Sequence, residues 1–373
     1  MQFQNDVFLC QKANGICRYA PEQMADDTSK MIKEIGSIFP LQGQKCGKQV
    51  LPQGGRVYMS LCREALLHIA RQNYANKIVL LPAYTCDTVY LPFLQEGWRL
   101  QFYSVNRDLR INTEALEKAV LNYKPSVVIA HPYYGYDFDA QELAALSRLE
   151  GVTIVVDNTQ CVFTQRRYDF ANYTVASLRK WGSIPDGAYF EGSDSVSCVL
   201  ENDSFVTLQQ QAMILRGEYF ETGGMDSKLE SIKLNKEAEA LICSNMEEHR
   251  MSDFAFSRYT DWNIGEICQK RIANYLYLHE RINEIDGVRP VRKDVAGLTT
   301  APLYYPIYCE DRKTIQKKLA AESIYAPVIW PVDDEFVLIG DDVKYIYDHI
   351  LCLVIDQRYD WADMERTLNV LRK

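Results

Sequence analysis

Short β-rich runs alternate with amphipathic stretches from about residue 56 onward, and this alternation is the feature that most constrains the fold of the chain. The amphipathic stretches are typical of helices, and the runs between them of buried strands. The expected order is helix 63–71, strand 77–81, helix 87–94, strand 99–105, a helix from Asn112, strand 126–130, helix 140–148 and strand 152–156. The pattern predicts an α/β fold with a mostly parallel, doubly wound sheet. Such sheets bind ligands beyond the carboxyl ends of their strands.

The rest of the chain predicts a smaller α+β unit. After Lys180 the alternation weakens: residues 199–200 are expected to close the sheet, and residues 203–249 are mainly helical with a break at Gly223 and Gly224. Further on we expect helices at 264–285, at 312–322 and from Asp360, and strands at 303–308, 326–330 and 350–355. With 373 residues, the chain is long enough for two domains. We predict an amino-terminal arm (1–50), a large domain (51–252) and a small carboxy-terminal domain (253–373).

Charge and composition exclude several classes of function. The net charge is −9 and the lysines and arginines are scattered, which argues against a nucleic-acid partner. The longest apolar runs, such as 152–156 and 350–355, are far shorter than the roughly 20 residues that cross a membrane. The eleven cysteines include no Cys-x-x-Cys pair, and no basic and then apolar segment follows Met1. We therefore expect buried free thiols in a cytoplasmic protein, with no metal site.

One aspartate and one lysine could carry chemistry at the sheet edge. Asp157 directly follows the strand at 152–156, which alone would fit a solvated turn residue equally well. Gln160 follows three residues later, and Lys180 ends a Ser-Leu-Arg-Lys block that begins at Ser177. A pyridoxal 5′-phosphate (PLP) site needs a lysine for a Schiff base, a carboxylate that keeps the pyridine nitrogen protonated, and donors for the phosphate. Lys180, Asp157 and Ser177 match these needs.

With further blocks, these residues make the chain resemble the DegT–DnrJ–StrS family of sugar aminotransferases, which have the aspartate-aminotransferase fold (fold type I). The resemblance covers residues from about 56 to the end, least clearly at 200–250. The matching blocks are Leu61-Cys62-Arg63-Glu64-Ala65-Leu66 (a phosphate loop), Leu81-Pro82-Ala83-Tyr84-Thr85, Ala130-His131-Pro132-Tyr133-Tyr134-Gly135, Asp157-Asn158-Thr159-Gln160, Ser177-Leu178-Arg179-Lys180 with Pro185-Asp186-Gly187, and Arg271-Ile272-Ala273-Asn274-Tyr275.

The resemblance implies a role for each predicted site residue. Lys180 would hold PLP as an internal aldimine, with Asp157 on the pyridinium nitrogen and Gln160 near the 3′-oxygen. Lys180 would also move the proton between the substrate Cα and the cofactor. The remaining cofactor-binding residues would be Cys62, Arg63, Glu64 and Ser177 at the phosphate, and Tyr84 and Cys86 near the ring. His131 ends a strand and is equally compatible with a site residue and with a structural one.

Several positions depart from the family pattern. Cys62 stands where glycine is usual and Arg63 where a hydroxyl residue is usual, so backbone amides and a guanidinium would bind the phosphate. Cys86 stands where an aromatic residue commonly stacks on the ring, which leaves Tyr84 or a residue from elsewhere to cover it. Residues 218–237 show no clear counterpart of the partner-subunit loop, and Ile329 replaces a common histidine before an aromatic-proline pair.

The function that the resemblance implies is transamination by a homodimer. An amino donor, glutamate or glutamine, would give its amino group to a keto acceptor, either a keto sugar or a nucleotide-linked keto sugar. Two alternatives stay open. One is a catalytically idle relative that acts as a binding or regulatory protein, suggested by Cys62, Cys86 and Ile329. The other is a PLP enzyme of another reaction type, such as a lyase, racemase or dehydratase, although the related dehydratases replace the lysine with histidine.

Overall fold

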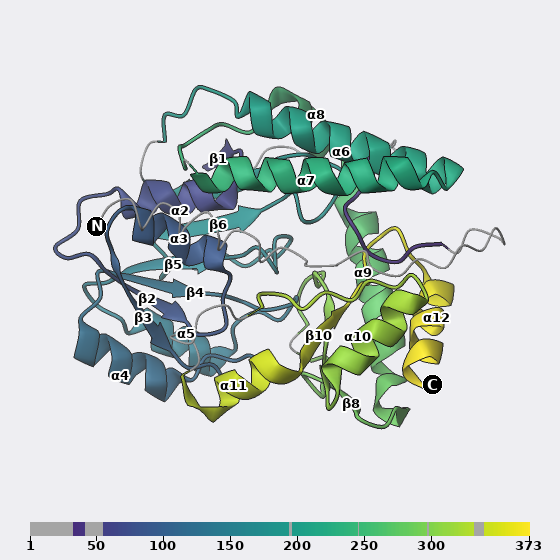
Figure 1. The fold of residues 1–373 in the computed structure, drawn as a ribbon. Coiled ribbons are helices and arrows are strands. Elements are labelled where there is room, and N and C mark those ends of the chain that lie inside the picture. The colour runs from purple at the N-terminus through teal and green to yellow at the C-terminus, as the bar shows by residue number, and fades with distance from the viewer. Residues whose placement is uncertain (1–32, 42–54, 194–195, 245, 297, 332–338) are drawn as a thin grey trace, which may run out of the picture.

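The computed structural model describes residues 33–41, 55–193, 196–244, 246–296, 298–331 and 339–373, and the chain forms two sheets (Figure 1). The larger sheet has seven strands in the order β1-β7-β6-β5-β4-β2-β3. Strands β2 to β6 pair in parallel, whereas β7 and β1 add antiparallel at one edge. The strands are β1 (Arg56–Met59), β2 (Ile78–Pro82), β3 (Arg99–Tyr103), β4 (Val127–Ala130), β5 (Thr153–Asp157), β6 (Tyr173–Ser177) and β7 (Ala188–Gly192).

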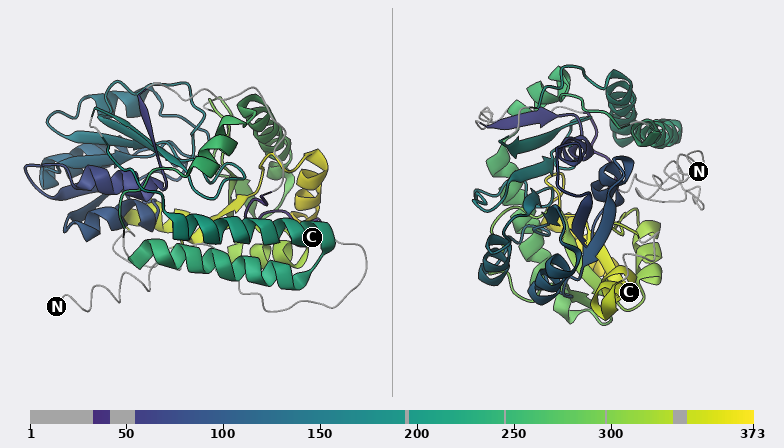
Figure 2. Two further views of the ribbon diagram at one scale, coloured as in Figure 1. Left: turned by 90° about the horizontal axis from the view of Figure 1, so that it is seen from above. Right: turned by 90° about the vertical axis from the view of Figure 1, so that its left-hand side faces the viewer.

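Helices cover both faces of the large sheet, as the strand sequences require (Figure 2). Successive residues of a strand point to opposite faces, so a strand buried on both faces must be apolar throughout. In β4, Val128 packs in one core cluster with Leu116 of α4, whereas Val127 packs in another with Leu66 of α2. Helix α2 (Cys62–Ala70) follows the antiparallel strand β1, whereas α3 (Asp87–Gln95), α4 (Thr113–Tyr123) and α5 (Ala140–Ser147) follow the parallel strands β2, β3 and β4. Asp139 opens α5 with a capping box.

The carboxy-terminal part contains a three-stranded antiparallel sheet in the order β10-β9-β8. Its strands are β8 (Val288–Pro290), β9 (Tyr305–Cys309) and β10 (Ile350–Leu353). The helices around it are α9 (Ile264–His279), α10 (Arg312–Ala321), α11 (Gly340–His349) and α12 (Trp361–Leu371). In the chain, the segment that connects the two sheets contains α6 (Asp203–Thr222), α7 (Met225–Ser244) and α8 (Asp253–Thr260). Helices α6 and α7 lie side by side as a long helical hairpin (Figure 2).

The structure confirms the predicted fold class and most of the predicted elements. Two predicted strands are wrong. Val199 and Leu200 are 76% and 75% exposed and belong to no strand, because β1 and β7 fill the sheet edge. Residues 326–330 are also irregular: Pro327 has no N–H for a ladder, and Trp330 has a φ of +59°. The predicted helix at 264–285 ends as an α-helix at His279.

The predicted domain boundaries keep the two sheets apart, since one sheet lies within residues 56–192 and the other within 288–353. Most of the predicted arm lies outside the described residues. Among the described residues, no helix has the length and apolar character needed to cross a membrane.

Gly135 offers a test of how closely the loop after β4 packs. Its φ is +85°, and a Cβ there would lie 2.9 Å from the backbone of Pro302 and Thr300. Gly135→Ala should therefore lower the free energy of unfolding by more than about 3 kcal/mol, since left-handed strain and a backbone clash add together. In the control Gly97→Ala, φ is +76° with no atom within 4 Å, and a loss of only about 1 kcal/mol is expected. Denaturant unfolding measures both variants, and equal losses of unfolding free energy in Gly135→Ala and Gly97→Ala would contradict the close packing at Gly135.

Candidate active site

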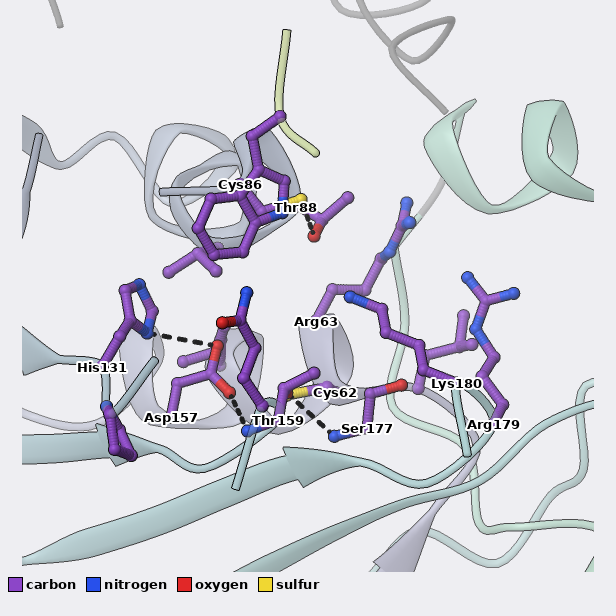
Figure 3. Close-up of a pocket in the computed structure, with 16 residues that line it drawn as sticks. Cys62, Arg63, Cys86, Thr88, His131, Asp157, Thr159, Ser177, Arg179 and Lys180 are labelled. Atoms are coloured by element: carbon purple, nitrogen blue, oxygen red, sulfur yellow. Dashed lines mark hydrogen bonds and ion pairs between the residues drawn. The ribbon is translucent and has the colours of Figure 1, made fainter. Parts of the chain in front are cut away.

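The predicted residues meet in a pocket at the carboxyl ends of the parallel strands (Figure 3). The pocket has a volume of about 550 Å³, counted with its open mouth. Asp157 ends β5 and Ser177 ends β6, as expected for a doubly wound sheet. The predicted residues that line it are Cys62, Arg63, Cys86, Asp157, Gln160, Ser177 and Lys180, and His131 lines it as well.

A tight turn between β6 and β7 presents Lys180. The backbone N–H groups of Leu178 and Arg179 both donate to the carbonyl of Gly187, at 2.9 and 3.2 Å. The buried Trp181 anchors the turn, because its indole N–H donates to the carbonyl of Thr159 at 2.9 Å. Lys180 itself is exposed, and Figure 3 shows its amino group projecting into the pocket. A fixed turn with a free amino group suits a lysine that binds a cofactor covalently.

Asp157 occupies one end of the pocket as a buried carboxylate. One of its oxygens accepts the backbone N–H of Thr159 at 2.9 Å, and the other lies 3.6 Å from Nδ1 of His131. Burial lowers the pKa of His131, although the nearby Asp157 favours the imidazolium. The imidazole is therefore neutral at pH 7, and its Nε2 lies 2.7 Å from the Thr85 hydroxyl. A neutral histidine leaves the charge of Asp157 available to a protonated ring nitrogen of a ligand.

Positive charge gathers at the opposite end, around the first turn of α2. Leu61 at the N-cap makes no side-chain cap hydrogen bond, and the N-terminus of a helix favours an anion. Arg63, Arg179 and Lys180 line the same end. Burial raises the pKa of Cys62 well above its usual value, so its thiol stays neutral there. This end is built to bind an anion.

A carboxylate from the helical hairpin already contacts the two arginines. Glu239 of α7 lies 2.8 Å from Nη1 of Arg179 and 3.6 Å from Nη2 of Arg63. Burial favours the protonated acid, but the two guanidinium groups outweigh it and lower the pKa of Glu239. Glu239 thus joins the hairpin to the anion-binding end, and no sequence motif indicated this contact.

Trp330 is a second contribution that the sequence did not indicate as a site residue. It lines the pocket opposite the sheet edge and comes from the segment before α11. Its φ of +59° is rare for a bulky residue, and such strain is concentrated at functional sites. Tyr84 does not line the pocket: it is fully buried, 4.9 Å behind the Trp330 ring. The aromatic surface that Cys86 cannot supply is therefore provided by Trp330.

Glu64 is the other predicted residue that the structure does not bring into the pocket. It is buried and accepts hydrogen bonds from the backbone of His249 at 3.0 Å. Gln160 lines the pocket and also fixes its wall, because its Oε1 accepts the N–H of Tyr134 at 3.0 Å. Thr159 joins the predicted residues: its hydroxyl accepts the N–H of Ser177 at 3.0 Å. The other lining residues that the sequence missed are Leu61, Leu66, Thr88, Val89, Pro132 and Arg179.

The donor set fits pyridoxal phosphate. The cofactor carries a ring nitrogen and a phosphate on opposite sides, and it forms a covalent bond with a lysine. The pocket provides a carboxylate at Asp157, anion donors around Arg63 and Ser177, and the amino group of Lys180. An indole at Trp330 adds an apolar surface for a flat ring.

Comparisons with solved structures agree with this fold. Aminotransferase PseC from Helicobacter pylori superposes with a TM-score of 0.63 at 14% identity, over 91% of this chain and 98% of that chain. A DegT DnrJ EryC1 StrS aminotransferase from Brucella abortus superposes with a TM-score of 0.57 at 16% identity, over 85% of each chain. NtdA from Bacillus subtilis, with bound cofactor PMP, superposes with a TM-score of 0.57 at 15% identity, over 85% of this chain and 73% of that chain.

No protein-family model matches the sequence, and no curated protein matches it either. The structural likeness nevertheless runs over most of each chain. The chain therefore has the fold of the PLP-dependent sugar aminotransferases that the sequence resembles.

The Glu239 contact predicts a pH-dependent stability. Glu239→Gln should lower the free energy of unfolding at pH 7 by roughly 3 kcal/mol, because it leaves buried guanidinium charge uncompensated. The folded-state pKa of Glu239 lies below the usual 4.5, so its contribution is present above pH 4.5 and is lost as pH falls through the folded pKa. The difference between the two proteins should accordingly shrink in acid.

The matched control is Glu117→Gln, which removes an exposed ion pair with Arg148. Its cost should stay below about 1 kcal/mol. Urea unfolding at several pH values measures both variants. If Glu239→Gln lowers the free energy of unfolding only slightly, or by an amount that does not change with pH, the contact between Glu239 and the two arginines contributes little to stability.

Proposed function

We propose that this chain is a PLP-dependent aminotransferase and that Lys180 binds the cofactor. The observation that carries the proposal is that one pocket combines Lys180, Asp157 and the anion-binding first turn of α2, in the fold of known aminotransferases. The three elements come from separate strands and a helix, and a chance lysine would not have both partners around it. The cofactor seen in NtdA belongs to that protein and supports the assignment by analogy.

Each end of the pocket has a defined task in this proposal. When bound, PLP supplies an electron sink that lets an amino acid lose the proton on its Cα. Asp157 keeps the pyridine nitrogen protonated, and the neutral His131 beside it leaves the carboxylate charge uncompensated. Arg63 and the amides at the start of α2 bind the phosphate, while the Ser177 hydroxyl adds a donor.

Lys180 does the proton transfer. Its amino group would hold the cofactor, and the same group would be the base that accepts the proton from the substrate Cα. The turn fixed on Gly187 keeps the amino group at the pocket while the side chain stays free to move. Trp330 covers the ring and excludes water from that side.

The substrates follow from the resemblance. We infer glutamate or glutamine as the amino donor and a keto sugar, free or nucleotide-linked, as the acceptor. The Helicobacter pylori structure is of an aminotransferase involved in the biosynthesis of pseudoaminic acid, which supports a sugar-like acceptor by analogy.

The same proposal includes a cytoplasmic homodimer. Cys62, Cys86, Cys161, Cys198, Cys268, Cys309 and Cys352 are all free thiols, as expected in a reducing compartment. The helical hairpin exposes large apolar side chains, which are typical of a subunit interface: Ile214, Leu229 and Leu241. Sedimentation of the purified chain distinguishes a dimer from a monomer.

Cofactor binding gives the first test. Added PLP should produce an absorption band near the edge of the visible range, borohydride should remove the band, and the cofactor should then be found attached to Lys180. Lys180→Ala should show no such band, whereas Lys233→Ala, an exposed lysine of α7, should behave like the unchanged chain. Absence of the band in the unchanged chain would favour a catalytically idle relative.

The reaction type gives the second test. Glutamate or glutamine should convert the band to that of the aminated cofactor, and a keto acceptor should restore it, because transamination consists of two reversible half-reactions. Stopped-flow absorbance measures both steps. A band that is lost in one direction only, with no amine returned to any acceptor, would instead indicate a lyase or another PLP reaction.

A further inference from the structure

A second cavity lies between the large sheet and the small one, apart from the candidate active site. Its volume is about 680 Å³, counted with its opening. One wall is the loop after β3, with Arg107, Asp108 and Arg110, and the other is the segment from Arg289 to Asp294, with Tyr308 of β9. No residue lines both this cavity and the candidate active site.

The lining of this cavity is basic in an acidic protein. Five of its residues are arginine or lysine and two are aspartate, whereas the whole chain has a net charge of −9. Arg110 is compensated by Asp108 and by Asp139, the latter at 3.0 Å. Among the described residues, neither Arg289 nor Arg292 forms an ion pair with a carboxylate. These two guanidinium groups leave positive charge available in the cavity.

Aromatic rings hold Arg289 in place. Its guanidinium lies 5.3 Å from the ring of Tyr345 and 5.4 Å from that of Tyr308, and Nη2 donates to the Tyr345 hydroxyl at 2.8 Å. Arg107 lies 4.3 Å from the same Tyr345 ring, and its ion pair with Asp342 is half exposed and therefore weak. Rings orient guanidinium groups without neutralising them.

Arg292 is held in the same way, but it is buried. It is only 8% exposed, stacks 4.3 Å from the ring of Tyr136, and donates from Nε to the carbonyl of Asp108 at 2.9 Å. Burial and the neighbouring Arg110 lower the pKa of Arg292, and together they outweigh the opposing effects of Glu142 and Asp108. A bound anion would relieve this electrostatic cost.

We propose that this cavity binds the phosphate group of a small molecule through Arg289 and Arg292, with Arg107 as an additional donor. Guanidinium groups match phosphate oxygens with paired hydrogen bonds, and three arginines that line one cavity suit a compact dianion or a diphosphate. Because the two arginine-bearing walls belong to different sheets, the bound anion joins them. The inference does not rest on the proposed aminotransferase activity.

Pyrophosphate is the probe, and titration calorimetry on the full chain measures its dissociation constant at constant ionic strength in sodium chloride. Arg289→Gln should raise that constant at least about tenfold, because one charged donor is lost. Arg292→Gln should do the same, with its unfolding midpoint measured separately because the side chain is buried. The control Arg148→Gln removes an exposed arginine of the large domain and should change the constant less than twofold.

Two further measurements distinguish this cavity from other anion sites. Saturating the unchanged chain with PLP should leave pyrophosphate binding unchanged; loss of binding on adding PLP, together with unaltered binding in Arg289→Gln, would place the anion in the candidate active site and overturn the proposal. If Arg289→Gln and Arg148→Gln weaken pyrophosphate binding equally, the attraction is nonspecific and the proposal is overturned as well. Succinate that bound as tightly as pyrophosphate would overturn the assignment to phosphate. Failure to bind PLP leaves the titration of the unloaded chain valid, so the two proposals fail separately.

Discussion

The parallel pairing of β5 with β6 is the constraint on which the candidate active site depends. In this register Asp157 lies opposite Val175, and the hydroxyl of Thr159 takes the N–H of Ser177 across the strand ends. A slip of one residue would turn Asp157 to the other face of the sheet. Close packing on both faces resists such a slip, because Val156 and its neighbours would have to fit into the core on the opposite face. Core packing thereby sets the geometry of the charged residues above it.

Two cavities show two ways to keep a guanidinium in place. At the candidate active site a carboxylate, Glu239, contacts Arg63 and Arg179, so one of the three positive charges there is balanced within the protein and the others are left for an anion. In the second cavity the rings of Tyr136 and Tyr345 orient Arg292 and Arg289 without neutralising them. The first arrangement ties a helical hairpin to a site, and the second leaves charge for an external anion.

The parallel strands β2 to β5 were predictable, because buried parallel strands are continuous apolar runs between amphipathic helices. The parallel strand β6 was not predicted, since its sequence Tyr-Thr-Val-Ala-Ser is not a continuous apolar run. The antiparallel strands β1 and β7 were not, since short strands with polar residues have no such signature. Residues 199–200 were wrongly predicted to close the sheet, because a run of only two apolar residues occurs in strands, helices and loops alike. Tyr84 was expected near the ring from its place in a motif, but only packing decided that Trp330 stands in front of it.

The sequence by itself determined the α/β order, the division between two sheets, and the grouping of Asp157, Gln160, Ser177 and Lys180. These follow from hydrophobic periodicity and from short motifs at strand ends, which are local properties of the chain. Only the tertiary structure decided that Glu239 contacts the arginines, that Trp330 faces the pocket, and that Arg289 and Arg292 share a basic cavity with Arg107. Those contacts join residues that are far apart in the chain, so no local pattern specifies them; side-chain packing between separate elements does.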